Sequence, residues 1–218
     1  MSKGINIHLP QTVNIMNTLL FTYLIALITA GNNFQDEKRL FNGVSLENWQ
    51  VIDFNGHGDI SVADSCIIIG KGELISGIRW TGDFPNTNYE ITLDAKRVSG
   101  SDFFCGMTFP VKDSFLTLVL GGWNGAVAGL SSINGYDAAN NETGTQYRFG
   151  SGWWYAVRLR VTDAKIEAWI EDEKIVDFTI GNSVLSLRSE VESSVPFGFT
   201  TYKTTGALRN IRLNMITE

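Results

Sequence analysis

The sequence predicts an all-β protein folded as a two-sheet jelly-roll sandwich. Hydrophobic and polar residues alternate with a period of two in segments such as 89–96 and 155–161, which is the pattern of a strand with one buried face. Gly, Asn and Asp separate many of these segments. About nine or ten such strands, without a convincing helical segment, are typical of two packed sheets.

The expected strands follow one another along the chain, and each is an apolar or alternating run. They are residues 60–69, 89–96, 103–109, 115–120, 155–161, 165–170, 175–180, 197–202 and 207–215. Residues 171–174, Glu-Asp-Glu-Lys, are expected to join two of these strands as a hairpin. The longest stretch without a clear pattern, 121–152, is expected to be a long loop, where binding usually resides.

Residues 1–31 are expected to be a signal peptide. The first 30 residues hold a single charged side chain, Lys3, and end in an apolar run over 19–30. This run of about a dozen residues is shorter than the roughly 20 that span a bilayer, so we expect a cleaved leader and no permanent membrane anchor. A buried core helix is the alternative. Cleavage would leave a single jelly-roll domain over 32–218, secreted or periplasmic.

The charge balance argues against a nucleic-acid partner. The chain has 17 basic and 23 acidic residues, and loss of Lys3 with the leader would change the net charge from −6 to −7. The only cysteines are Cys66 and Cys105, and each lies in an apolar run. Two buried free thiols are therefore favoured over a disulfide bond.

Three segments in order carry a resemblance to a known family. Leu-Phe-Asn-Gly at 40–43 with Trp49, the hairpin over 169–177, and Leu-Arg-Asn-Ile-Arg-Leu at 208–213 resemble the 3-keto-disaccharide hydrolase family. The segments 80–85 and 102–106 are similar to a planctomycete-type variant of it. The resemblance covers residues 40–216.

This resemblance implies a concanavalin-like jelly roll whose first and last strands pair and close the domain. It also implies a secreted or periplasmic protein that acts on a carbohydrate, as a hydrolase or lyase that cleaves glycosides oxidised at the sugar 3-position. A ketone acidifies the neighbouring C–H, so one base and one proton donor would suffice for elimination. The alternative function is a non-catalytic, lectin-like sugar-binding or cell-surface module on the same fold.

Three carboxylates, Asp83, Asp102 and Glu142, are the candidates for a catalytic base. Histidine chemistry is nearly excluded, because His8 lies in the expected leader and His57 is the only other histidine. The Glu-x-Asp-x-x-Glu strand of laminarinase-type glucanases is absent as well, which disfavours a standard two-carboxylate glycosidase. Ordinary hydrogen bonding within loops is the alternative role for these acids.

Candidates for substrate binding are aromatic residues and the polar side chains near them. They are Arg79, Trp80, Trp123, Asn140, Glu167 and Trp169. Arg79 could hold a ketone oxygen or a carboxylate. Trp169 and Glu167 share the polar face of their strand, so the indole is expected to face solvent or a cleft, where it could stack on a pyranose. A partly covered surface tryptophan fits the pattern equally well.

Calcium is the one candidate cofactor, and no metal-ligating residue is assigned. Residues 53–64 imitate a calcium loop, with alternating polar side chains, Gly58 at the sixth position and Asp64 at the twelfth. The imitation is imperfect, because His57 replaces an oxygen ligand and Asp64 is shorter than the usual Glu. A plain connection between strands is the alternative.

Overall fold

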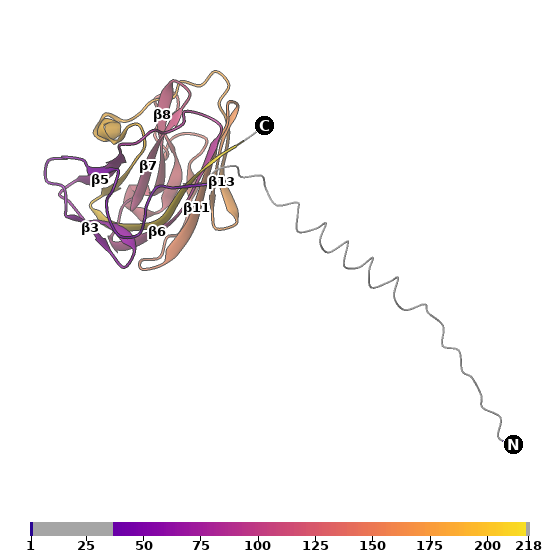
Figure 1. Ribbon diagram of the computed structural model, residues 1–218. Coiled ribbons are helices and arrows are strands. Elements are labelled where there is room, and N and C mark those ends of the chain that lie inside the picture. Colours follow the sequence, from indigo (N-terminus) through magenta and orange to yellow (C-terminus); the bar gives the residue numbers. More distant parts are fainter. Residues whose placement is uncertain (2–36, 217–218) are drawn as a thin grey trace. The chain divides into compact units, whose positions relative to one another are not determined.

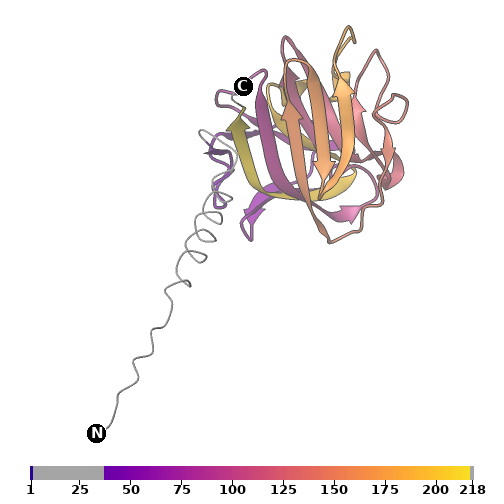
Figure 2. The ribbon, with the colours of Figure 1, turned by 90° about the vertical axis from the view of Figure 1, so that its right-hand side faces the viewer.

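Two antiparallel sheets make up the computed structural model, which describes Met1 and residues 37–216 (Figures 1 and 2). The expected signal peptide, residues 1–31, lies outside the described residues. Residues 37–216 fall within one compact unit. Helical structure in this part of the chain is limited to a short α2 (Gly122–Gly125) and a 3-10 helix, η1 (Ser189–Ser194).

The first sheet has eight strands, and several of them lie side by side in Figure 2. Its order is β13 (Glu173–Thr179), β12 (Lys165–Ile170), β11 (Trp154–Val161), β6 (Tyr89–Gly100), β15 (Thr204–Met215), β4 (Cys66–Ile69) and β3 (Ile60–Ala63), with β1 (Lys38–Arg39) also paired to β15. The second sheet has seven strands. Its order is β10 (Thr145–Gln146), β9 (Val127–Ser131), β8 (Ser114–Gly121), β7 (Cys105–Val111), β14 (Gly198–Tyr202), β5 (Ile75–Trp80) and β2 (Trp49–Val51).

The hydrophobic core is made by alternate residues of facing strands, as the period of two predicts. On β12, Ile166, Ala168 and Ile170 are buried while the residues between them are half-buried. On the second sheet, Leu118 and Phe199 are fully buried in the same core cluster. The predicted all-β jelly-roll sandwich is confirmed.

The two ends of the described chain pair with each other, as the sequence indicates. Lys38 is opposite Leu213 in the register of β1 and β15. Just beyond β1, the N–H of Leu40 donates to the carbonyl of Ile211 at 2.9 Å. The indole N–H of Trp49 in turn donates to the carbonyl of Leu40 at 2.8 Å, which joins the opening segment to the core.

The structure corrects the predicted elements at several positions. Residues 60–69 form a hairpin, β3 and β4, because Asp64 and Ser65 turn the chain with positive φ values of 49° and 57°. Residues 75–80 form β5, although their alternation is broken by Gly77. The expected loop 121–152 contains α2, β9 and β10; β9 escapes detection because it is short, holds small residues and is buried on both faces.

Cys66 and Cys105 are buried free thiols, as expected. Burial raises the pKa of Cys105 to about 12 and raises that of Cys66 as well. Both thiols are therefore held in the protonated, unreactive form near neutral pH.

Candidate functional site

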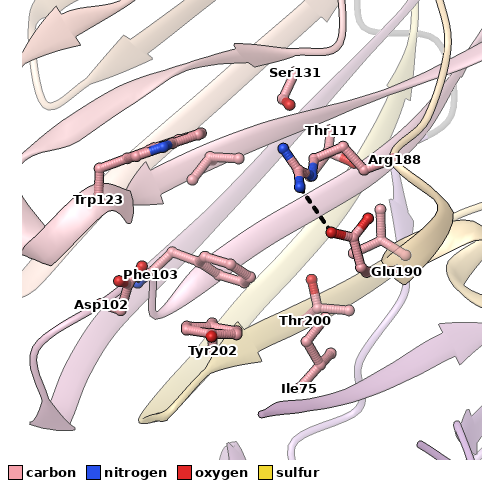
Figure 3. A pocket seen from close by; sticks show the side chains of 12 residues that line it. Ile75, Asp102, Phe103, Thr117, Trp123, Ser131, Arg188, Glu190, Thr200 and Tyr202 are labelled. Carbon is pink, nitrogen blue, oxygen red and sulfur yellow. Dashed lines mark hydrogen bonds and ion pairs between the residues drawn. The ribbon is translucent and has the colours of Figure 1, made fainter. Parts of the chain in front are cut away.

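A cavity of about 320 Å³ lies on the face of the second sheet that points away from the first sheet (Figure 3). Its floor is formed by side chains that alternate along the strands with core residues such as Leu118 and Phe199. Connecting segments form its walls. The lining residues are Ile75, Asp102, Phe103, Thr117, Val119, Trp123, Ser131, Arg188, Glu190, Val191, Thr200 and Tyr202.

Glycines on the floor strands allow neighbouring side chains to lie close to the sheet. A Cβ atom at Gly106 would lie 2.7 Å from the Thr200 hydroxyl oxygen and 3.1 Å from the Phe103 ring. At Gly77 a Cβ would lie 2.8 Å from Cγ2 of Thr200. Larger residues at these positions would therefore push side chains into the cavity.

One wall is a strap, which we define as residues 184–194. The strap is joined to the end of β9 because the backbones of Ser132 and Ser186 exchange two hydrogen bonds of 3.1 Å. It then presents Arg188 and Glu190 to the cavity, where their side chains bond at 2.7 Å. This pairing lowers the pKa of Glu190 and raises that of Arg188. Arg188 also lies 3.5 Å from a carboxylate oxygen of Asp137.

The opposite wall carries Asp102 and Trp123 (Figure 3). One Asp102 oxygen accepts the backbone N–H of Phe103 at 2.8 Å, and the other accepts that of Asn124 at 3.3 Å. Trp123 has a left-handed backbone, with φ of 49°, and its side chain is partly exposed. Below them the Phe103 ring stacks on Tyr202, with centroids 5.9 Å apart. The cavity thus brings carboxylates, a guanidinium and aromatic rings together.

Two of the residues that the sequence singled out, Asp102 and Trp123, line this cavity. Asn140 lies just behind it, because its amide donates at 2.8 Å to Asp137, which in turn contacts Arg188. Glu142 is exposed on the same loop and is not among the lining residues.

Three others lie around β5. Arg79 donates two hydrogen bonds to the side-chain oxygen of Gln50, at 3.0 and 2.8 Å. Trp80 is only 4% exposed and packs edge-on against Trp49 in the core, with centroids 5.3 Å apart, so it offers no face to a ligand. Asp83 is exposed beside a separate hollow that Lys38 also lines.

Glu167 and Trp169 lie on the first sheet, away from the cavity. The Arg158 guanidinium sits 3.7 Å from the centre of the Trp169 ring, and the Lys174 ammonium sits 5.1 Å from it. Lys174 also bonds to Glu167 at 2.6 Å. The indole is a partly covered surface tryptophan, the second of the two interpretations that the pattern allowed.

The calcium-like segment 53–64 serves as a connection between strands. β3 begins at Ile60, so Asp64 is carried away from Asp59 and reaches the hairpin turn. Within residues 37–216, no three His, Cys, Asp or Glu side chains gather closely enough to hold a metal ion.

The cavity residues that sequence reasoning missed include Thr117, Ser131, Arg188 and Glu190. The only local signal for the last two is a charged pair in a stretch without strand pattern. Thr117 and Ser131 could not be recognised, because their role depends on which strands are neighbours.

Comparison with known proteins assigns the chain to a family. The model of the 3-keto-alpha-glucoside-1,2-lyase-like domain matches residues 36–214. The chain belongs to this family. The match confirms the family expected from the sequence and covers both walls of the cavity. It makes the protein a member of a carbohydrate-active domain family.

Solved structures similar to this lyase-like domain confirm its fold. A Parabacteroides distasonis protein provisionally named a glycosyl hydrolase is 15% identical, with a TM-score of 0.54 over 83% of this chain and 94% of that one. The carbohydrate binding module CBM66 from Bacillus subtilis is 11% identical, with a TM-score of 0.52 over 77% and 95%.

A third similar structure is domain 4 of AbnA, a GH43 extracellular arabinanase from Geobacillus stearothermophilus, in complex with arabinotriose. It is 16% identical, with a TM-score of 0.53 over 82% of this chain and 90% of that one. No curated protein matches the lyase-like domain. In the described part of the chain, no helix combines the length and apolarity needed to cross a membrane.

Proposed function

We propose that the protein is a secreted enzyme that cleaves 3-keto-glycosides in the cavity of the second sheet. The observation that carries the proposal is that two carboxylates, Asp102 and Glu190, line the same cavity as the Arg188 guanidinium. Family membership supports the same chemistry. The volume is at the lower end of the roughly 300–1,000 Å³ typical of small-molecule sites.

The reaction is an elimination. A carboxylate removes the proton from C2, which the neighbouring C3 ketone makes acidic, and the electron pair forms an enolate. The enolate then restores the ketone, forms the C1–C2 double bond and breaks the bond from C1 to the glycosidic oxygen, which takes up a proton. Addition of water to the resulting enone gives the free 3-keto sugar.

The residues have separate roles. Asp102 or Glu190 is the base, since both are carboxylates in the cavity and stand on opposite walls (Figure 3). Arg188 stabilises the enolate, because a guanidinium has five N–H donors and its bonds to Glu190 and Asp137 leave others free. Trp123 offers an indole surface to the sugar ring.

A non-catalytic sugar-binding module is the second candidate function. The exposed indole of Trp123 and the stacked pair of Phe103 and Tyr202 favour it, since aromatic faces bind pyranose rings without further chemistry. In this case the carboxylates would accept hydrogen bonds from sugar hydroxyls.

Product analysis with 3-keto-trehalose separates the two candidates. The enzyme should release glucose, and replacing the base should lower kcat/KM by about 100-fold or more. We would compare Asp102→Asn and Glu190→Gln with matched controls that lie outside the cavity, Asp113→Asn and Glu192→Gln. Absence of cleavage by the wild type, together with retained sugar binding, would leave the binding module as the function.

A further inference from the structure

Ser131 is a buried hydroxyl that lacks a partner and faces the cavity. The residue is 2% exposed, and Oγ makes no hydrogen bond within the described chain. Figure 3 shows the hydroxyl on the side of the residue that faces Arg188. A buried hydroxyl without a hydrogen-bond partner lowers the stability of the fold. Its position in a cavity therefore suggests that a bound ligand supplies the missing partner.

Other unpaired buried hydroxyls in the described residues lie elsewhere. Ser194 Oγ and Thr201 Oγ1 also lack partners, but neither residue lines the cavity. Among the unpaired side-chain atoms found between residues 37 and 216, Ser131 Oγ is the one that belongs to a residue lining the cavity.

Ser131 stands at the end of a row of hydroxyls that crosses three neighbouring strands. Thr108 on β7 is opposite Thr117 on β8, and Thr117 is opposite Ser131 on β9. The two threonine hydroxyls bond to each other at 3.1 Å. Thr117 therefore has a protein partner and also lines the cavity, whereas Ser131 keeps both its donor and its acceptor capacity.

The cavity is covered at both ends of the floor. Beside Ser131, the strap is bonded to Ser132, and the carbonyl of Thr143 lies 2.8 Å from where a Cβ of Gly129 would be. At the β5 end, the ring of Phe54 lies 3.2 Å from the corresponding position at Gly77. These contacts limit the length of the floor, which favours a single sugar ring over an extended glycan laid along the sheet.

The charge of the cavity fits a neutral sugar. Arg188 is matched by two carboxylates, Glu190 and Asp137, and Asp102 adds a further acid on the opposite wall. A uronic acid would bring another negative charge toward this set and would be repelled.

We propose that Ser131, supported by Thr117, binds a hydroxyl group of one neutral terminal sugar ring, so that the protein takes glycoside ends rather than internal units. The inference rests on the proposed function for the location of the sugar. It adds the substrate class and a residue that determines specificity.

Calorimetric titration with unoxidised trehalose tests this proposal without requiring cleavage. Ser131→Ala should weaken binding about 2- to 13-fold, the range for loss of one neutral hydrogen bond. It should not lower the melting temperature, because the removed hydroxyl has no partner in the described chain. Ser194→Ala is the matched control and should bind as the wild type does.

Monodeoxy trehaloses then identify the partner hydroxyl. For the analogue that lacks the partner hydroxyl, the wild type should bind as weakly as Ser131→Ala binds trehalose. Ser131→Ala should bind this analogue and trehalose with equal affinity. Equal affinity of Ser131→Ala and wild type for trehalose would overturn the inference, and so would equal binding of a glucan whose terminal ring is blocked. Trehalose binding without cleavage of 3-keto-trehalose would refute only the proposed enzyme. Absence of any sugar binding would refute both.

Discussion

Arg97 on the first sheet donates a hydrogen bond from Nη2 to the carbonyl of Gly125, at 3.1 Å, beyond the end of the second sheet. The same nitrogen reaches the carbonyl of Gly121 at 3.3 Å, and Nη1 reaches that of Phe149 at 3.3 Å. Gly121 and Gly125 flank the turn that carries Trp123. A buried cation thus holds a wall of the cavity through backbone carbonyls.

Loss of this cation should destabilise the protein and disturb the wall. Arg97→Met leaves three carbonyls without their donor, so we expect a loss of about 3 kcal/mol or more in the free energy of unfolding. Arg209→Met is the control, since Arg209 forms a partly exposed pair with Asp94 and should cost about 1 kcal/mol or less. Denaturant unfolding measures both; equal losses would contradict a special role for Arg97.

The two tryptophans proposed for sugar binding should behave differently. Trp123→Ala should reduce trehalose affinity about 10-fold, because it removes an aromatic surface from the cavity. Trp169→Ala should change affinity less than about 2-fold, since Arg158 covers that ring on the other sheet. Calorimetric titration of both variants checks the prediction. A larger loss for Trp169→Ala would move the sugar site to the first sheet.

The thiols should resist alkylation in the native protein. With the pKa of Cys105 raised to about 12, roughly one molecule in ten thousand would carry the thiolate at pH 8. Iodoacetamide should therefore label neither cysteine within an hour, and both should react once urea unfolds the chain. The mass of the intact protein shows how many cysteines are alkylated. Rapid labelling of Cys105 in the native protein would contradict the prediction, because it would show that the reagent reaches this thiol.

The contribution of Glu90 to stability should fall with rising pH. Burial raises the pKa of this carboxyl above its ordinary value of 4.5, although Arg158 opposes the change from 3.7 Å. The folded state therefore holds the proton to higher pH than the unfolded state, and stability is lost as pH rises from about 4.5 through the raised pKa.

Glu90→Gln should remove that decline and raise the stability at pH 7 relative to wild type, with the difference disappearing at low pH. Glu190→Gln should act in the opposite sense. Its carboxyl has a lowered pKa through Arg188, so it stabilises the fold above about pH 4.5 and loses that effect as pH falls through the lowered pKa. Unfolding curves from pH 3 to 8 would show whether the two differences have opposite signs.

The strands that the sequence revealed are those with one buried face. β12 alternates without interruption and was predicted with its observed bounds. β9 was missed because loop 143–144 covers its outer face, so its five residues are all buried and show no alternation. A period-two pattern identifies a strand that has one face exposed to solvent. It cannot identify a strand whose outer face is covered by a loop.

The site was less accessible to sequence reasoning than the fold. Asp102 and Trp123 could be singled out, the first as an acid just before an expected strand and the second as an aromatic in the expected loop 121–152. Trp80 looked similar in the sequence, yet it fills the core beside Trp49. Arg188 reaches the cavity only because the strap crosses from β9 toward β5 and β14, and such long-range placement leaves no local pattern.

Mass spectrometry of the products from 3-keto-trehalose in deuterated water tests the central claim most directly. Elimination followed by addition of water should yield glucose and a 3-keto sugar whose carbon-bound deuterium at C2 exceeds the amount that enolisation introduces in an enzyme-free control. Replacing the base, by Asp102→Asn or Glu190→Gln, should slow the formation of both products about 100-fold. Cleavage without deuterium at C2 would contradict the elimination. Intact substrate after prolonged incubation with the wild type would contradict the enzyme itself.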